Sequence, residues 1–281
     1  MRCTRVSDGC RECWHLKTAD RLCKNPGLPE NERNALAGKE SFVLRERELS
    51  EPLRIKKPSI IGVQFMGDLF HENVPYEFIQ KAYEIMQTCN KHTFLILTKR
   101  ANRMAKIVPE VIINLHRSNL PLDNVWHGLT VCNQQEADEK MPLLLKSWPG
   151  KKWISIEPML GPIKLWDHNI DECPIYYDGC NCRDGIDAVV LGGETGTEAR
   201  PIHPDWVRFV RDQCRDSAIP FFFKGWGKRI PCVKNLMESG ANEYFRSVFH
   251  TTFEGQRKSR LLDGREHNDL PWRVNENPTQ Q

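Results

Sequence analysis

Short apolar segments alternate with amphipathic ones over most of the chain. Six apolar segments have the length and composition of strands, and they span residues 59–65, 93–98, 125–131, 153–156, 187–191 and 220–223. Amphipathic segments at 75–88, from residue 100 onward, at 134–147 and at 204–216 predict helices between them. Nearly continuous apolar strands joined by helices are typical of a parallel sheet with both faces buried.

This alternation predicts an α/β fold, built as a partial (β/α) barrel with about six parallel strands. A three-layer open sheet is the alternative, because periodicity does not tell whether a sheet closes. We expect a single domain over residues 1–254, with a polar connector and short helix at 26–57 and an insertion at 167–185. Residues 255–281 are expected to form a C-terminal tail, in which the segment LLDGREH (261–267) is the one compact motif.

Composition narrows the class of protein. The chain has 281 residues, of which 40% are hydrophobic and 27% charged, and this balance excludes a largely disordered protein. The net charge of +3 is too small to indicate a protein that coats nucleic acid. No apolar run approaches the ~18 residues of a membrane span, and the first ten residues lack the apolar core of a signal peptide. We therefore expect a cytoplasmic protein without a membrane partner.

Eleven cysteines are the unusual feature of the composition. Their odd number prevents complete pairing in disulfides, and no export signal supports a disulfide framework. Cys3, Cys10 and Cys13 form a C-x6-C-x2-C motif, with a predicted turn between the first two. Thiolates select zinc, copper(I) or iron–sulfur clusters, and three ligands instead of four leave one metal position free to react. The alternatives are a zinc site completed by His15 or Cys23, and three unrelated thiols.

A second group of cysteines lies in the insertion, where Cys173, Cys180 and Cys182 form C-x6-C-x-C near His168. A spacing of one residue between the last two suits a tetrahedral site poorly. We therefore favour an ordinary loop with free thiols over a second metal site.

Polar residues and glycines follow five of the six predicted strands. Each has a structural interpretation of its own, as a helix cap, a solvated helix start, an ion pair or a turn. The carboxyl ends of parallel strands meet at one edge of a sheet, so together these residues are expected to surround one mouth. The residues are Asp68, Lys99, Arg100, Glu157, Gly192, Gly193, Glu194 and Lys224.

Eight stretches resemble successive blocks of one family, in order and over nearly the whole chain. They are CTRVSDGCREC-W, MGDLFHENVP, LTKRANRM, ADEKMPLLL, SIEPMLGP, GGETG-x-EARPIHPDWVRFVRDQC, IPFFFKGWG and LLDGREH. The sequence resembles the uncharacterised phage and prophage proteins that carry an N-terminal three-cysteine motif. These proteins are distant relatives of the radical S-adenosylmethionine (SAM) enzymes and are distantly similar to spore photoproduct lyase.

The resemblance implies a barrel of the radical SAM type and a [4Fe–4S] cluster held by Cys3, Cys10 and Cys13. SAM would bind the fourth iron, and one electron from a carrier such as flavodoxin or ferredoxin would convert it to methionine and a 5′-deoxyadenosyl radical. That radical would take a hydrogen atom from the substrate, while the protein orients the cofactors and excludes water.

The strand-end residues can be matched to these needs. Asp68 would accept from the SAM ammonium group, and Lys99 and Arg100 would bind its carboxylate. The glycine turn at 192–196 would allow close approach of the adenosyl group. The implied cofactor-binding residues are Asp68, Lys99, Arg100, Gly192, Gly193, Glu194 and Trp14, and the implied catalytic residues are Glu157 and Lys224.

Two features depart from the family pattern. Its members usually carry a further segment before the first cysteine, so we expect the first barrel strand to be missing or supplied differently. Trp14 also stands where the family usually has Tyr, which keeps a flat face for adenine but loses the hydroxyl group.

The substrate is open at this point, with a nucleic acid, a nucleotide and a peptide all compatible with the sequence. Two alternatives to a radical enzyme also remain. One is a zinc-stabilised nucleic-acid-binding protein without turnover, and the other is an inactive, truncated member of the family.

Overall fold

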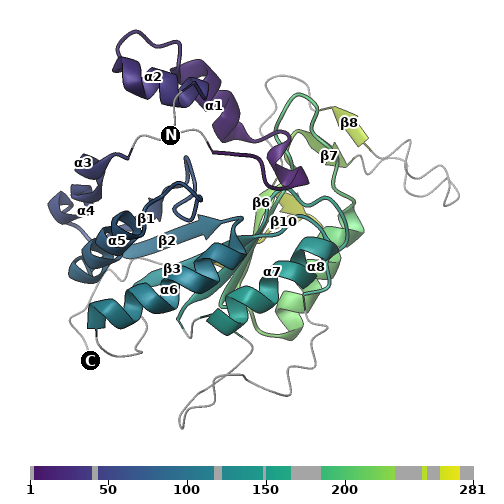
Figure 1. The fold of residues 1–281 in the computed structure, drawn as a ribbon. Coiled ribbons are helices and arrows are strands. Elements are labelled where there is room, and N and C mark those ends of the chain that lie inside the picture. Colours follow the sequence, from purple (N-terminus) through teal and green to yellow (C-terminus); the bar gives the residue numbers. More distant parts are fainter. Residues whose placement is uncertain are drawn as a thin grey trace, which may run out of the picture.

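The computed structural model describes residues 3–39, 44–116, 122–147, 150–165, 185–231, 249–251 and 260–272. Its central element is a six-stranded parallel sheet with the order β1-β2-β3-β4-β5-β6 (Figure 1). The strands are β1 (Ile60–Val63), β2 (Thr93–Thr98), β3 (Val125–Thr130), β4 (Lys152–Ile156), β5 (Ala188–Gly192) and β6 (Phe221–Gly225). The sheet is a half-barrel, so the expected α/β fold with six parallel strands in a partial (β/α) barrel is confirmed.

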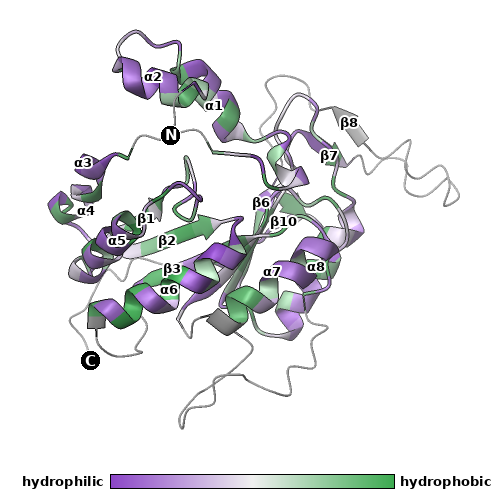
Figure 2. Ribbon diagram, in the orientation of Figure 1, coloured by the Kyte–Doolittle hydropathy of each residue, from purple (hydrophilic) through white to green (hydrophobic). Residues whose placement is uncertain are grey.

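Four helices cover one face of the sheet: α5 (Tyr76–Thr88), α6 (Ala101–His116), α7 (Gln134–Ser147) and α8 (Pro204–Asp216). Hydrophobic and hydrophilic residues alternate along these helices in Figure 2, and the buried ones belong to the same core as the strands. α8 begins where the pattern predicts, because Pro204 suits the first turn and the N-cap His203 accepts from the backbone N–H of Asp205 through Nδ1 at 3.2 Å. Alternate strand residues fill the space beneath, among them Phe94, Ile96, Leu129, Ile154, Leu191 and Phe223.

A smaller apolar cluster covers the opposite face of the sheet, and it depends on the end of the chain. The ring of Trp272 packs edge-to-face against Trp126 and Trp153, with centroids 5.2 and 5.3 Å apart. The preceding segment forms the hairpin β9 (Leu261–Leu262) and β10 (Arg265–Glu266), and Asn268 bridges to Phe222 of β6. Residues 260–272, which fall within the expected C-terminal tail, therefore pack against the sheet.

The N-terminal segment lies at the carboxyl ends of the strands (Figure 1). It contains the 3-10 turn η1 (Asp8–Cys10), at the position where a turn is predicted, and the helix α1 (Trp14–Leu22). The polar connector contains three short helices where one was expected: α2 (Glu30–Ala37), α3 (Glu46–Leu49) and α4 (Glu51–Arg54). The remaining elements, β7 (Arg229–Pro231) and β8 (Phe249–Thr251), pair antiparallel after β6.

The insertion with Cys173, Cys180 and Cys182 lies outside the described residues. Within the described ranges, no helix combines the length and the apolar character needed to cross a membrane.

Substitution of Trp272 by alanine tests the apolar cluster that it forms. The side chain is buried against two other indole rings, so we expect Trp272→Ala to lower the free energy of unfolding by about 3–5 kcal/mol, measured by urea denaturation. The control is Phe209→Ala on the exposed face of α8, for which a change within about 0.5 kcal/mol is expected. Equal losses in the two variants would contradict the packing described here.

Candidate active site

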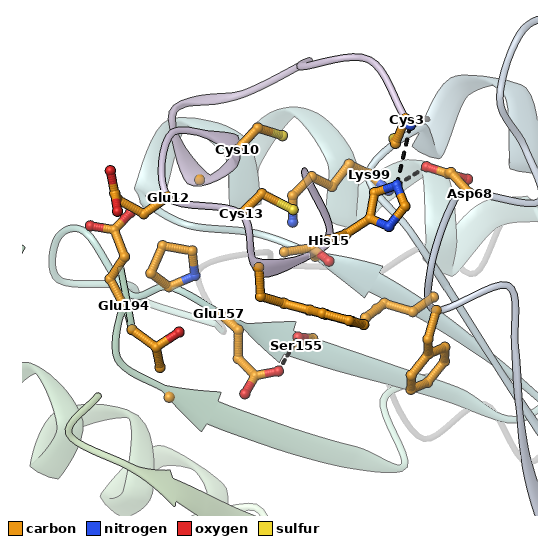
Figure 3. Close-up of a pocket in the computed structure, with 18 of the residues that line it drawn as sticks. Cys3, Cys10, Glu12, Cys13, His15, Asp68, Lys99, Ser155, Glu157 and Glu194 are labelled. Atoms are coloured by element: carbon orange, nitrogen blue, oxygen red, sulfur yellow. Dashed lines mark hydrogen bonds between the residues drawn. The ribbon is translucent and has the colours of Figure 1, made fainter. Parts of the chain in front are cut away.

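A cavity of about 260 Å³ lies where the loops after the strands meet the N-terminal segment (Figure 3). Every site residue expected from the sequence lines it, although these residues come from six separate parts of the chain. They are Cys3, Cys10, Cys13, Trp14, Asp68, Lys99, Arg100, Glu157, Gly192, Gly193, Glu194 and Lys224. The carboxyl ends of the strands therefore do meet at one mouth.

Asp68 follows β1 and is buried, with its carboxylate surrounded by donors from the protein. Oδ1 accepts from the backbone N–H of Phe70 at 2.9 Å and from the hydroxyl of Thr98 at 2.7 Å. Oδ2 accepts from the backbone N–H of Lys99 at 3.3 Å and from Nη1 of Arg100 at 2.9 Å. Four donors satisfy the carboxylate within the protein, which connects the β1 loop to the end of β2.

The guanidinium group of Arg100 is also hydrogen-bonded within the protein, and only 5% of this side chain is exposed. Nε donates to Glu72 at 2.8 Å, Nη1 to Asp68 at 2.9 Å and Nη2 to the hydroxyl of Thr4 at 2.6 Å. Nη1 also lies 3.7 Å from the sulfur of Cys3 and donates to it. Arg100 therefore connects the sheet to residues 3–13, which we call the cysteine loop.

A second arginine holds the other part of the cysteine loop. Glu194 is buried after β5, and it accepts from the backbone N–H, Nε and Nη2 of Arg200 at 2.8, 3.0 and 2.6 Å. Nη2 of Arg200 also donates to the carbonyl oxygen of Asp8 at 2.9 Å. Each side of the cysteine loop is thus bound by an arginine that a buried carboxylate orients.

Glycines let the cysteine loop and the strand ends approach closely. A Cβ atom at Gly9 would collide with the sulfur of Cys132, and one at Gly196 would collide with the side chain of Glu12. A Cβ atom at Gly193 would collide with the carbonyl oxygen of Trp226 in the loop after β6. Gly193 is therefore required by packing within the protein, whatever it also allows a ligand to do.

Glu157 and Lys224 form an ion pair on the wall of the cavity. Nζ of Lys224 lies 2.9 Å from Oε1 of Glu157, and the hydroxyl of Ser155 donates to Oε2 at 3.2 Å (Figure 3). The Lys224 side chain is 63% exposed, so the pair is in contact with solvent in the mouth. It presents an acceptor and a donor side by side to a molecule that enters.

Lys99 offers a positive charge that the protein itself does not use. In the described part of the chain its side chain has no hydrogen bond or ion pair, and it extends toward the cysteines in Figure 3. Two exposed aromatic residues, Trp14 and Phe65, line the same cavity with 52% and 41% of their surface accessible. The cavity thus combines a free cation with flat apolar surfaces.

The three cysteines offer soft donors in this cavity. Cys10 is buried and Cys3 and Cys13 are partly buried, and burial raises the pKa of the Cys3 thiol. The nearby carboxylates of Asp68 and Glu194 are paired with arginines, whereas the three thiols, with the imidazole of His15, line the same cavity. Across the described ranges no three His, Cys, Asp or Glu side chains are already grouped around an ion position. The donor chemistry fits a thiolate-bound metal or cluster.

His15 and Cys23 differ in their relation to the site. His15 lines the cavity, and its Nε2 accepts from the backbone N–H of Cys3 at 3.4 Å, whereas Cys23 is not among the lining residues. Sequence reasoning missed Thr4, Glu72 and Arg200, which hold the loop. Arg200 stands six residues after Glu194, but nothing in that local spacing reveals its contact with Asp8.

Comparison with known proteins establishes the family. A family model described as protein of unknown function (DUF5131) matches residues 1–271, and the chain therefore belongs to this family. No curated protein and no solved structure matches the chain. The expected membership of an uncharacterised family is confirmed, while the relation to radical SAM enzymes and to phage proteins stays a prediction.

Substitution of Gly193 by alanine tests the contact between the loops after β5 and β6. The new methyl group would meet a backbone oxygen, which cannot rotate away, so we expect a loss of about 1–3 kcal/mol in the free energy of unfolding. Gly161→Ala is the matched control because no atom lies within 4 Å of its added Cβ. A chemical denaturation series that ranks the two variants equally would contradict the close approach.

Cys132 lies beneath the cysteine loop, and its reactivity is a further test. Burial raises its pKa to about 12, and the thiolate is the reactive form, so we expect almost no modification by iodoacetamide at pH 8. Partly exposed Cys23 should react in the same sample. Peptide mass spectrometry of the native protein measures both, and rapid labelling of Cys132 would show that the loop does not cover it.

Proposed function

We propose that this protein is a radical SAM enzyme with an iron–sulfur cluster on Cys3, Cys10 and Cys13. The observation that carries the proposal is the position of these thiols, which line one cavity with all nine other residues expected at the site. A [4Fe–4S] cluster held there would deliver one electron to SAM, so that a carbon–sulfur bond breaks to give methionine and a 5′-deoxyadenosyl radical, which takes a hydrogen atom from the substrate. A separate carrier such as flavodoxin or ferredoxin must supply the electron.

Lys99 is the residue that we assign to the carboxylate of SAM. Its ammonium group is unpaired among the described residues and faces the cavity. Arg100, expected to share this task, and Asp68, expected to accept from the SAM ammonium group, have their polar atoms engaged within the protein. In the proposal they shape the site and hold the cysteine loop, and Glu194 does the same through Arg200.

The apolar surfaces and the ion pair serve the remaining groups. Trp14 follows the third cysteine directly and offers an exposed ring on which adenine can stack. Glu157 and Lys224 offer an acceptor and a donor that can orient a polar group of the substrate. A nucleotide or nucleic acid is compatible with an aromatic surface beside cations.

The metal content of anaerobically purified protein tests this function. We expect iron and acid-labile sulfide in equal amounts, and release of 5′-deoxyadenosine when reductant and SAM are added. Cys3→Ala, Cys10→Ala and Cys13→Ala should each lower bound iron more than about tenfold, because each removes a ligand. Cys23→Ala is the control, since this thiol does not line the cavity.

The same measurement separates a second candidate function. His15 lies beside Cys3 in the cavity, so three thiolates and this imidazole could hold a structural zinc ion. Zinc without sulfide, lost on substitution of His15, would favour a zinc-stabilised binding protein. Iron and zinc contents that are both unchanged in all three cysteine variants would eliminate both metal sites.

A further inference from the structure

We propose that Arg100 is a positioning residue for Cys3: it fixes the sulfur at the mouth of the cavity and tunes the reduction potential of the metal centre through an N–H···S hydrogen bond. The inference rests on the proposed function, because it assigns a role toward the cluster. It goes beyond that function because it assigns Arg100, which was expected to bind SAM, to Cys3, a cysteine that would ligate the cluster.

The contacts of Arg100 determine the direction of its guanidinium group. Glu72 and Asp68 bind Nε and Nη1 at 2.8 and 2.9 Å, so two carboxylates from the loop after β1 fix the plane of the group. The remaining edge faces the cysteine loop, where Nη2 donates to Thr4 and Nη1 to the sulfur of Cys3. Nη1 of Arg100 reaches the sulfur of Cys3 because Glu72 and Asp68 hold the guanidinium group in this orientation.

Cys3 differs in this respect from the other two cysteines. In the described part of the chain, only the sulfur of Cys3 receives a hydrogen bond from a charged donor, whereas the sulfur of Cys10 has the hydroxyl of Ser7 at 3.8 Å. The side chain of Arg100 is nearly buried, so water screens this interaction little. An arginine also keeps its proton at any working pH, which makes it a permanent donor.

An N–H donor to a ligating thiolate withdraws negative charge from the sulfur. The reduced cluster carries one more negative charge than the oxidised one, so the donor stabilises the reduced form more and raises the reduction potential. Removal of the donor should therefore shift the potential to more negative values. A lysine in its place keeps the charge near Asp68 but lacks the planar fork that reaches four partners.

The experiment compares Arg100→Lys with Arg200→Lys in the full chain, reconstituted anaerobically. Both arginines hold the cysteine loop, but only Arg100 contacts a cysteine sulfur, so Arg200→Lys is the matched structural control. The cluster potential is measured by redox titration followed by electron paramagnetic resonance. We expect a more negative midpoint potential, or selective loss of iron, in Arg100→Lys, and an unchanged potential in Arg200→Lys. Equal iron content and equal potentials in the two variants would overturn the proposal.

A second measurement needs no metal. Hydrogen–deuterium exchange of the apoprotein should become faster at residues 3–6 in Arg100→Lys and near residue 8 in Arg200→Lys, because each loses its own contact with the loop. Exchange at residues 3–6 that is unchanged would overturn the positioning role. Arg100→Gln is the second substitution if lysine prevents folding. If wild-type protein binds no iron or sulfide, the proposed function fails, while the exchange experiment still decides whether Arg100 positions Cys3.

Discussion

The site depends on a buried ion pair between Asp68 and Arg100. Two charges removed from water are stable only when further hydrogen bonds satisfy them, and here Thr98, Glu72 and Thr4 complete the set. Their partners lie on the loop after β1, at the end of β2 and on the cysteine loop. If one partner is lost, an uncompensated charge remains in the interior, so the three segments are held in a single arrangement. The pair therefore determines where the first cysteine stands relative to the sheet.

The opposite side of the mouth repeats this arrangement with different elements. Glu194 after β5 orients Arg200, and Arg200 reaches the backbone of the cysteine loop at Asp8. The loop is consequently held from two sides of the mouth, after β1 and β2 on one side and after β5 on the other, and the cavity is the space left beneath it. The groups that the protein does not use for this purpose are Lys99, the Glu157–Lys224 pair and the exposed ring of Trp14. We base the proposed binding of SAM and substrate on these groups.

The elements of the fold were predictable because their causes are local. The strands and the helices α5, α7 and α8 follow from apolar periodicity, and the observed bounds differ from the predicted ones by at most two residues. The role of Trp272 was not predictable in this way, since a single aromatic residue in a polar segment carries no periodic signal. Its burial depends on Trp126 and Trp153, which approach it only when β3 and β4 lie side by side.

The sequence by itself determined which residues are candidates for the site and in what order they occur along the chain. Three thiols come first, and polar residues then follow successive parallel strands. That was sufficient to place all twelve candidate residues at one mouth, because parallel strands end at the same edge of a sheet. Only the tertiary structure decided which of them are free and which are bound to each other. Arg100 contacts Cys3 across 97 positions and Arg200 contacts Asp8 across 192. The physical reason is that each of these hydrogen bonds depends on how two distant segments are placed relative to each other. A local sequence pattern does not contain that information.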